Sequence, residues 1–277
     1  MKFTKMQGIG NDYVYVNCFE EKIDDPAAVA VAISKPHYGI GSDGLILIGP
    51  SDTADFEMRI FNADGSEADM CGNGIRCVGK YVYERGLTDK TELTISTMAG
   101  LKKLWLTVEE GHVTLVRVDM GAPCLDPKKI PVALEGDMIR QYPLVIDGKE
   151  WPVTCVSMGN PHAVVFVEDP LKLDLPAIGP RFENNPVFPK RTNTEFIRVI
   201  SRDELQMRVW ERGACETLAC GTGACASLVA AVVNGYADRR ATLHLIGGDL
   251  IVEWNEEDGH VYQAGPAEFV FDGEWNQ

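Results

Sequence analysis

The sequence predicts an α+β protein with two pseudo-symmetric domains, each a mixed or antiparallel β-sheet barrel wrapped around a central helix. The first observation is that FEMRIFNADGSEADMCGNG (56–74) aligns without a gap on LQMRVWERGACETLACGTG (205–223). The second is that further matching segments follow the same order in both halves. The third is the apolar, helix-like run after each Cys-Gly-x-Gly turn. Together they indicate an internal duplication.

Strand signals repeat along the two halves. KMQGIGNDYVYV (5–16) resembles SMGNPHAVVFV (157–167), because each has a methionine, a Gly/Asn turn and then an alternating apolar strand. Later, LTVEEGHVTLVRV (106–118) resembles IVEWNEEDGHVYQA (251–264), and both predict a hairpin with an acidic-Gly turn. MGAP and AGPA close the two repeats. Chance explains one such match, but not several in the same order.

A helix is expected after each Cys-Gly turn. The second run, residues 221–235, is apolar on nearly all sides, which indicates a buried helix surrounded by strands. Gly86 and Gly235 are expected to end the two helices. The expected domains are residues 1–119 with a returning segment 266–277, and residues 120–265. The active site is expected in the cleft between them.

Composition limits the kinds of partner. The 277 residues are 45% hydrophobic and 24% charged, which is typical of a globular protein with a real core. A formal charge of −15 argues against binding to nucleic acid or to an anionic membrane. The sequence shows neither an apolar run near the length of a membrane span nor a signal peptide. With eight sparse cysteines, we expect a cytoplasmic protein with free thiols.

Cys71 and Cys220 are the strongest candidates for chemistry. Each directly precedes an expected helix, where unpaired backbone N–H groups and the helix dipole favour a thiolate. The glycines that follow leave the backbone open to a ligand. Two such thiols, one from each half, predict one base for each face of a substrate carbon. The other interpretation, a small buried hydrophobe, fits the cysteines within apolar runs: Cys18, Cys77, Cys155 and Cys225.

No motif indicates a metal or a cofactor. The sequence has no C-x-x-C and no H-x-x-x-H, and its five histidines are scattered. Gly8-x-Gly10 lacks the third glycine of a dinucleotide fingerprint, because position 13 is a tyrosine. We therefore expect neither a metal site nor a bound cofactor.

His162 and the adjacent pair Glu211 and Arg212 each have two possible interpretations. His162, in GNPHAVV, fits an ordinary histidine at a strand end as well as a functional one. Glu211 and Arg212, in VWERGACE, fit either a solvated ion pair or a substrate-binding pair near Cys220. The place of Glu211 and Arg212 in the duplicated block keeps the substrate-binding interpretation open.

Six segments together resemble the diaminopimelate epimerase family: KMQGIGNDYV, FNADGSEADMCGNGIRC, SMGNPHAVV, RTNTEF, ERGACETLACGTGACA and GPAEFVFDG. They cover essentially the whole chain, in order. The resemblance implies an enzyme of lysine biosynthesis that interconverts LL- and meso-diaminopimelate with Cys71 and Cys220, without pyridoxal phosphate or metal. It also implies a small amino-acid substrate and a homodimer.

The resemblance assigns roles to further residues. His162 and Glu211 match residues that tune the two thiols, and Phe271 matches an aromatic dimer contact where tyrosine is familiar. Gly44 stands where many members have glutamine, so no contact is carried over to it. The residues that match substrate contacts are Asn11, Asn62, Gly72, Asn73, Asn160, Asn193, Glu211, Arg212, Gly221 and Thr222.

Two other functions remain open. A related two-cysteine racemase of proline or hydroxyproline would share the fold and the thiols. However, Arg212 and four asparagines fit a substrate with a distant polar group better. A thiol redox or binding protein would instead show dithiol chemistry, with no exchange of a substrate α-hydrogen.

Overall fold

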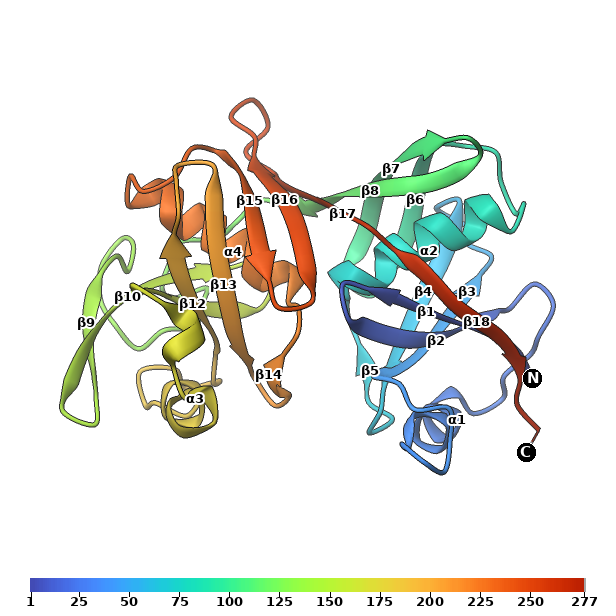
Figure 1. The fold of residues 1–277 in the computed structure, drawn as a ribbon, viewed down its shortest axis with the longest axis horizontal. Helices are drawn as coiled ribbons and strands as arrows, with labels where there is room; N and C mark the ends of the chain where they lie inside the picture. Colours follow the sequence, from blue (N-terminus) through green and yellow to red (C-terminus); the bar gives the residue numbers. More distant parts are fainter. Residues whose placement is uncertain (277) are drawn as a thin grey trace. The chain divides into compact units, whose positions relative to one another are not determined.

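The computed structural model describes residues 1–276, which fold as two compact units (Figure 1). The first unit comprises Met1–Asp119 and Ala264–Gln277, and the second comprises Met120–Gln263. Strands dominate both units, and few helices accompany them. Among the helices of residues 1–276, none has the length and apolar character needed to cross a membrane.

The first unit has one run of paired strands around a helix. Its elements are β1 (Lys2–Gly8), β2 (Asn11–Asn17), α1 (Pro26–Ser34), β3 (Gly44–Gly49), β4 (Phe56–Asn62), β5 (Glu67–Ala68), α2 (Gly72–Glu84), β6 (Glu92–Thr97), β7 (Gly100–Glu109), β8 (His112–Gly121) and β18 (Glu268–Glu274). Strand β1 pairs antiparallel with both β18 and β2, and β3 pairs antiparallel with β4. The pairs β2–β3 and β4–β6 are parallel.

The second unit repeats this pattern. Its elements are β9 (Tyr142–Ile146), β10 (Lys149–Ser157), β11 (Pro161–Phe166), η1 (Pro170–Lys172), α3 (Leu175–Glu183), β12 (Asn193–Val199), β13 (Glu204–Glu211), β14 (Cys215–Thr217), α4 (Gly221–Val233), β15 (Arg240–Leu245), β16 (Gly248–Trp254) and β17 (Val261–Gly265). The pairs β11–β12 and β13–β15 are parallel, at the positions of β2–β3 and β4–β6. Strand β9 pairs with β10 as β18 pairs with β1. The predicted pseudo-symmetric fold class is therefore confirmed.

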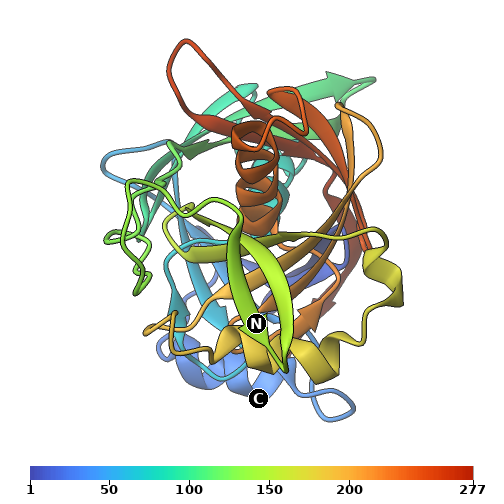
Figure 2. The same cartoon turned by 90° about the vertical axis from the view of Figure 1, so that its left-hand side faces the viewer.

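Helices α2 and α4 lie inside their own units. Residues 72–82 of α2 are all buried, and α4 is buried from Gly221 to Ala231 except at Thr222. Strands of the second unit surround α4 (Figure 2). Gly86 and Gly235 take left-handed conformations, with φ of +71° and +76°, just beyond the helix ends. These stop signals are confirmed, although the last helical residue of α4 is Val233 and not residue 235.

Candidate active site

Each buried helix begins at a candidate cysteine. Cys71 is the N-cap residue of α2, with φ −136° and ψ 112°, and Cys220 is the N-cap residue of α4, with φ −124° and ψ 110°. The matching extended backbones place each sulfur beside the unpaired N–H groups of a first helical turn. Across residues 1–276 no group of His, Cys, Asp or Glu side chains could hold a metal ion.

Cys71 is held by groups of the first unit. Its Sγ accepts the N–H of Gly74 at 3.3 Å, and its S–H donates to Oδ1 of Asn11 at 3.2 Å. The amide of Asn11 donates in turn to Oδ2 of Asp43 at 2.6 Å. Burial raises the pKa of Asp43. The start of β2 and the loop before β3 therefore support this half-buried thiol.

Cys220 has a different environment. Its side chain is buried, with Sγ 3.6 Å from Oγ1 of Thr222. Burial first, and then the negative charges of Glu211 and Glu195, raise the pKa of Cys220 well above its ordinary value. The backbone N–H of Gly223 lowers the pKa of Cys220, as expected at a helix N-terminus, but burial and the two carboxylates act in the opposite direction.

A chain of side-chain hydrogen bonds leads from β12 to Cys220. His162 Nδ1 lies 2.7 Å from Oε1 of Glu195, and His162 Nε2 lies 2.9 Å from Oδ1 of Asn160. Asn160 Nδ2 donates to Oγ1 of Thr222 at 3.2 Å. Thr222 contacts Cys220, and its hydrogen bond lowers the pKa of that thiol. His162 thus belongs to a buried network and does not stand alone at a strand end.

Glu211 and Arg212 take different partners. The carboxylate of Glu211 accepts hydrogen bonds from the Thr217 hydroxyl and from Cys220. Burial raises the pKa of Glu211. Arg212 is exposed, and its Nη1 donates to the carbonyl of Lys190 at 3.1 Å. Of the two interpretations, the structure therefore places Glu211 beside Cys220 and does not show an ion pair with Arg212.

Three predicted substrate residues use their amides inside the fold. Asn73 accepts from Arg76 Nη1 at 2.9 Å, and Asn62 donates to Ser66 Oγ at 3.0 Å. Asn193 accepts the N–H of Arg212 and donates to a β11 carbonyl, both at 2.9 Å. These hydrogen bonds hold the three amides in fixed positions, and direct substrate contact by their side chains stays a prediction.

Glycines near the cysteines have close neighbours. A Cβ at Gly221 would lie 2.8 Å from Oε1 of Gln263, so the side chain of Gln263 would have to move to admit any other residue at this first position of α4. A Cβ at Gly44 would collide with the backbone carbonyl of Phe61. A glutamine, which the family resemblance leads one to expect at position 44, could not replace Gly44 on this backbone.

Phe271 lies on β18 and is 46% exposed. Its ring packs edge-on against Phe3, with centroids 5.8 Å apart. An aromatic side chain is thus held in place on the surface of the first unit, and its role as a dimer contact stays a prediction.

Sequence reasoning missed Glu195. This residue is fully buried on β12 and pairs with His162. The signal was present in the segment RTNTEF, where an acidic residue occurs in a strand that otherwise reads as core. A buried carboxylate needs a partner, and that need points to a histidine on the neighbouring strand.

The comparison with family models decides the family. A model described as diaminopimelate epimerase matches residues 3–125 and 154–270. The chain belongs to the diaminopimelate epimerase family. It is 61% identical over 274 residues to a diaminopimelate epimerase of Acetivibrio thermocellus, which covers 99% of this chain and 98% of the relative. A diaminopimelate epimerase of Methanococcus maripaludis is 56% identical over 274 residues and covers 99% of both chains.

Solved structures with low sequence identity share the fold. A PhzF-family phenazine biosynthesis protein of Bacillus anthracis has a TM-score of 0.70 at 20% identity, and covers 100% of this chain and 99% of its own. A hydroxyproline epimerase of Agrobacterium vitis also has a TM-score of 0.70, at 16% identity, with coverage of 99% and 91%. Family membership makes the chain an amino-acid epimerase of the diaminopimelate type.

Proposed function

We propose that the chain interconverts LL- and meso-2,6-diaminopimelate in lysine biosynthesis, by a two-base reaction of Cys71 and Cys220. The observation that carries this proposal is the equivalent place of the two thiols, each capping a buried helix of its own unit. Inversion of a carbon centre requires a base on one face and an acid on the other. Family membership supports the substrate.

The helix N-termini suit the chemistry. The α-proton of an amino acid is a very weak acid, so negative charge that builds up during its removal needs stabilisation. Unpaired N–H groups in the first turns of α2 and α4 can bind a carboxylate and stabilise that charge. In this proposal Gly72, Asn73, Gly221 and Thr222 act mainly through their backbone N–H groups.

The two thiols have different resting roles in the proposal. Cys220 keeps its proton, because burial and the Glu211 and Glu195 carboxylates raise its pKa. Cys71 accepts a backbone N–H and is less buried, so it is the better base of the free enzyme. The first turnover then begins with proton removal by Cys71 and ends with protonation by Cys220. The pair shares one proton, and its titration belongs to both thiols.

The exposed guanidinium of Arg212 suits the distal end of the substrate, because its planar fork can bind a carboxylate through two hydrogen bonds. The amides of Asn11 and Asn160, both in networks that reach a catalytic thiol, suit a polar amino-acid substrate. We also propose that the enzyme is a cytoplasmic homodimer, in which the exposed ring of Phe271 contributes to the interface.

The proposed function is tested with purified enzyme and LL-diaminopimelate in deuterated buffer. We expect meso product that carries deuterium at the inverted carbon, and no conversion of L-proline or trans-4-hydroxy-L-proline under the same conditions. Conversion of either proline substrate, with none of diaminopimelate, would establish the racemase alternative. Dithiol oxidation without any α-hydrogen exchange would establish the redox alternative.

A further inference from the structure

Glu183 is a buried carboxylate with three hydrogen-bond donors around it. It is the last residue of α3 and is 6% exposed. Oε2 accepts the indole N–H of Trp210 at 2.8 Å, and Oε1 accepts the backbone N–H of Gly213 at 3.0 Å. Oε1 also accepts Nη1 of Arg191 at 2.9 Å. Trp210 and Gly213 come directly before and after the dipeptide 211–212, so the carboxylate of Glu183 is hydrogen-bonded to both residues that flank it.

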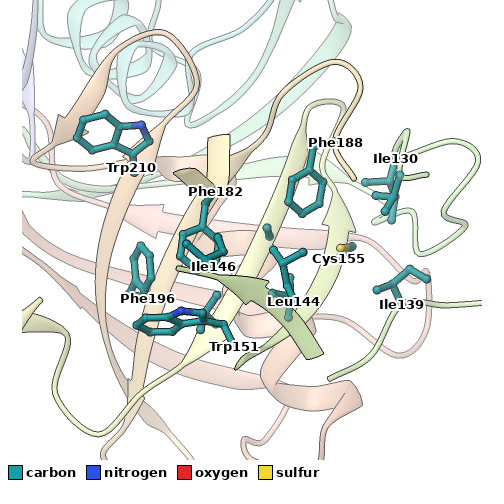
Figure 3. Close-up of a cluster of buried hydrophobic side chains, with 14 of the residues drawn as sticks. Ile130, Ile139, Leu144, Ile146, Trp151, Cys155, Phe182, Phe188, Phe196 and Trp210 are labelled. Atoms are coloured by element: carbon teal, nitrogen blue, oxygen red, sulfur yellow. The ribbon is translucent and has the colours of Figure 1, made fainter. Parts of the chain in front are cut away.

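The apolar core of the second unit fixes Glu183 in place. The preceding residue, Phe182, is fully buried between Trp151 and Phe196, at centroid distances of 5.6 and 5.3 Å (Figure 3). Gly179 lets α3 approach β13 closely, because a Cβ at this position would collide with the indole of Trp210. The carboxylate of Glu183 is therefore rigid relative to β13.

Arg212 depends on the residues that Glu183 holds. Its backbone N–H is fixed by Asn193, and the next residue, Gly213, is in the left-handed region with φ +81° and is fixed by Glu183. The guanidinium of Arg212 rests on the carbonyl of Lys190. Lys190 precedes Arg191, which has a φ of +59° and whose guanidinium donates a hydrogen bond to the carboxylate of Glu183. A left-handed backbone at a bulky residue persists only where its surroundings hold it.

We propose that Glu183 is a positioning residue for the epimerase reaction, which fixes the guanidinium of Arg212 in the orientation that binds the distal carboxylate of the substrate. This inference rests on the proposed function, which assigns that carboxylate to Arg212. Glu211 is less dependent on Glu183, because Thr217 on β14 holds its carboxylate.

The first test replaces Glu183 by an amide of nearly the same size. Glu183→Gln cannot accept three donors from both sides and leaves at least one of them buried without a partner. We expect the KM for LL-diaminopimelate to rise about tenfold to a hundredfold, with a much smaller change in kcat. The control is Asp174→Ala, which removes the N-cap of the same helix, where Asp174 accepts the N–H of Ala177 at 3.2 Å. This variant should be less stable and keep the wild-type KM.

A second variant guards against a failure of Glu183→Gln to fold. The side chain of Arg191 is 53% exposed, so Arg191→Met should fold. It removes one partner of Glu183 and loosens the loop that supports the guanidinium of Arg212. We expect its KM to rise in the same direction by a smaller factor. An unchanged KM in every variant of Glu183 and Arg191 that folds would overturn the inference.

A double-mutant cycle with Arg212→Met separates positioning from general damage. If Glu183 acts through Arg212, Glu183→Gln should raise KM in the wild-type background and change it by less than about twofold when Arg212 is already absent. Equal factors in both backgrounds would overturn the positioning role and leave the proposed function intact. A wild-type KM in Arg212→Met alone would contradict the proposed role of Arg212, and the inference would fall with it.

Discussion

His162 Nδ1 lies 2.7 Å from Glu195 Oε1, and neither side chain has any exposed surface. The other oxygen of Glu195 is buried without a hydrogen-bond partner among residues 1–276. Such a carboxylate is costly to bury, and its bond to the imidazole is the contact that offsets the cost. The pair begins the hydrogen-bond chain that reaches Cys220 through Asn160 and Thr222.

Removing one member of this buried pair should destabilise the protein strongly. Glu195→Ala leaves His162 without its carboxylate partner and opens a void, so we expect a loss of about 3–5 kcal/mol in the free energy of unfolding. Urea unfolding at pH 7.5 measures it. The control is Asp147→Ala, because Asp147 and Arg181 form an ion pair with side chains 57% and 58% exposed. That variant should lose no more than about 1 kcal/mol. An equal loss of unfolding free energy in the two variants would show that the buried pair stabilises the fold no more than an exposed ion pair does.

The Thr222 hydroxyl should tune the Cys220 thiol. Its hydrogen bond lowers the pKa of Cys220, so Thr222→Val should raise that pKa further and reduce the thiolate fraction at a given pH. Because Cys220 is the proton donor of the free enzyme in the proposed reaction, we expect the alkaline limb of the kcat/KM profile against pH to move to higher pH in Thr222→Val and to stay near its original position in Thr222→Ser. The charged groups that act on Cys220 are the carboxylates of Glu211 and Glu195, and they are the same in both variants. Identical profiles for the two variants would exclude the hydroxyl as a tuning group.

The duplicated fold was predictable because its signals are local. Gly/Asn turns, alternating strands and two Cys-Gly-x-Gly helix starts are each visible in short segments, and their repeated order gives the pairing. Cys71 and Cys220 could be found in the same way, because a helix N-cap is defined by the residues next to it.

The environment of Cys220 was not predictable from these signals. It depends on Glu195, which lies 25 residues before the cysteine in sequence and reaches it only through the packing of β12 against α4. Glu183 is a similar case. It is an acidic residue at a helix end, where sequence patterns predict exposure, and only the approach of α3 to Trp210 buries it. Propensity and periodicity do not carry such tertiary information.

Buried thiols should make the protein less stable in alkali. Burial raises the pKa of Cys155 from 9.0 to about 12. The folded state then holds this proton more tightly than the unfolded state, so its contribution is complete below about pH 9 and is lost as the pH rises towards 12, by up to about 1.4 kcal/mol per pH unit. Between pH 8 and 11 the wild type should lose about 2–3 kcal/mol more than Cys155→Ala, as measured by urea unfolding. Parallel curves for the two proteins would contradict the assigned pKa direction.

Alkylation should distinguish the two active-site thiols. Cys71 is half-buried and accepts a backbone N–H, whereas Cys220 is buried and has a raised pKa. Because the thiolate is the reactive form, we expect iodoacetamide at pH 7.5 to modify Cys71 about tenfold faster or more than Cys220. Peptide mapping over time gives both rates, and the exposed Cys215 supplies the rate of a surface thiol in the same sample. Faster labelling of Cys220 than of Cys71 would reverse the assignment of base and acid in the free enzyme.

The central claim is that Cys71 and Cys220 are the two bases of one epimerisation. The most direct measurement follows the conversion of LL- to meso-diaminopimelate in deuterated buffer by the wild type, Cys71→Ala and Cys220→Ala, with near-wild-type folding of each variant checked by circular dichroism. The two-base reaction predicts that the wild-type product carries deuterium at the inverted carbon and that neither variant forms it, because each lacks either the base or the acid. Conversion at the wild-type rate by either alanine variant would contradict the two-base reaction.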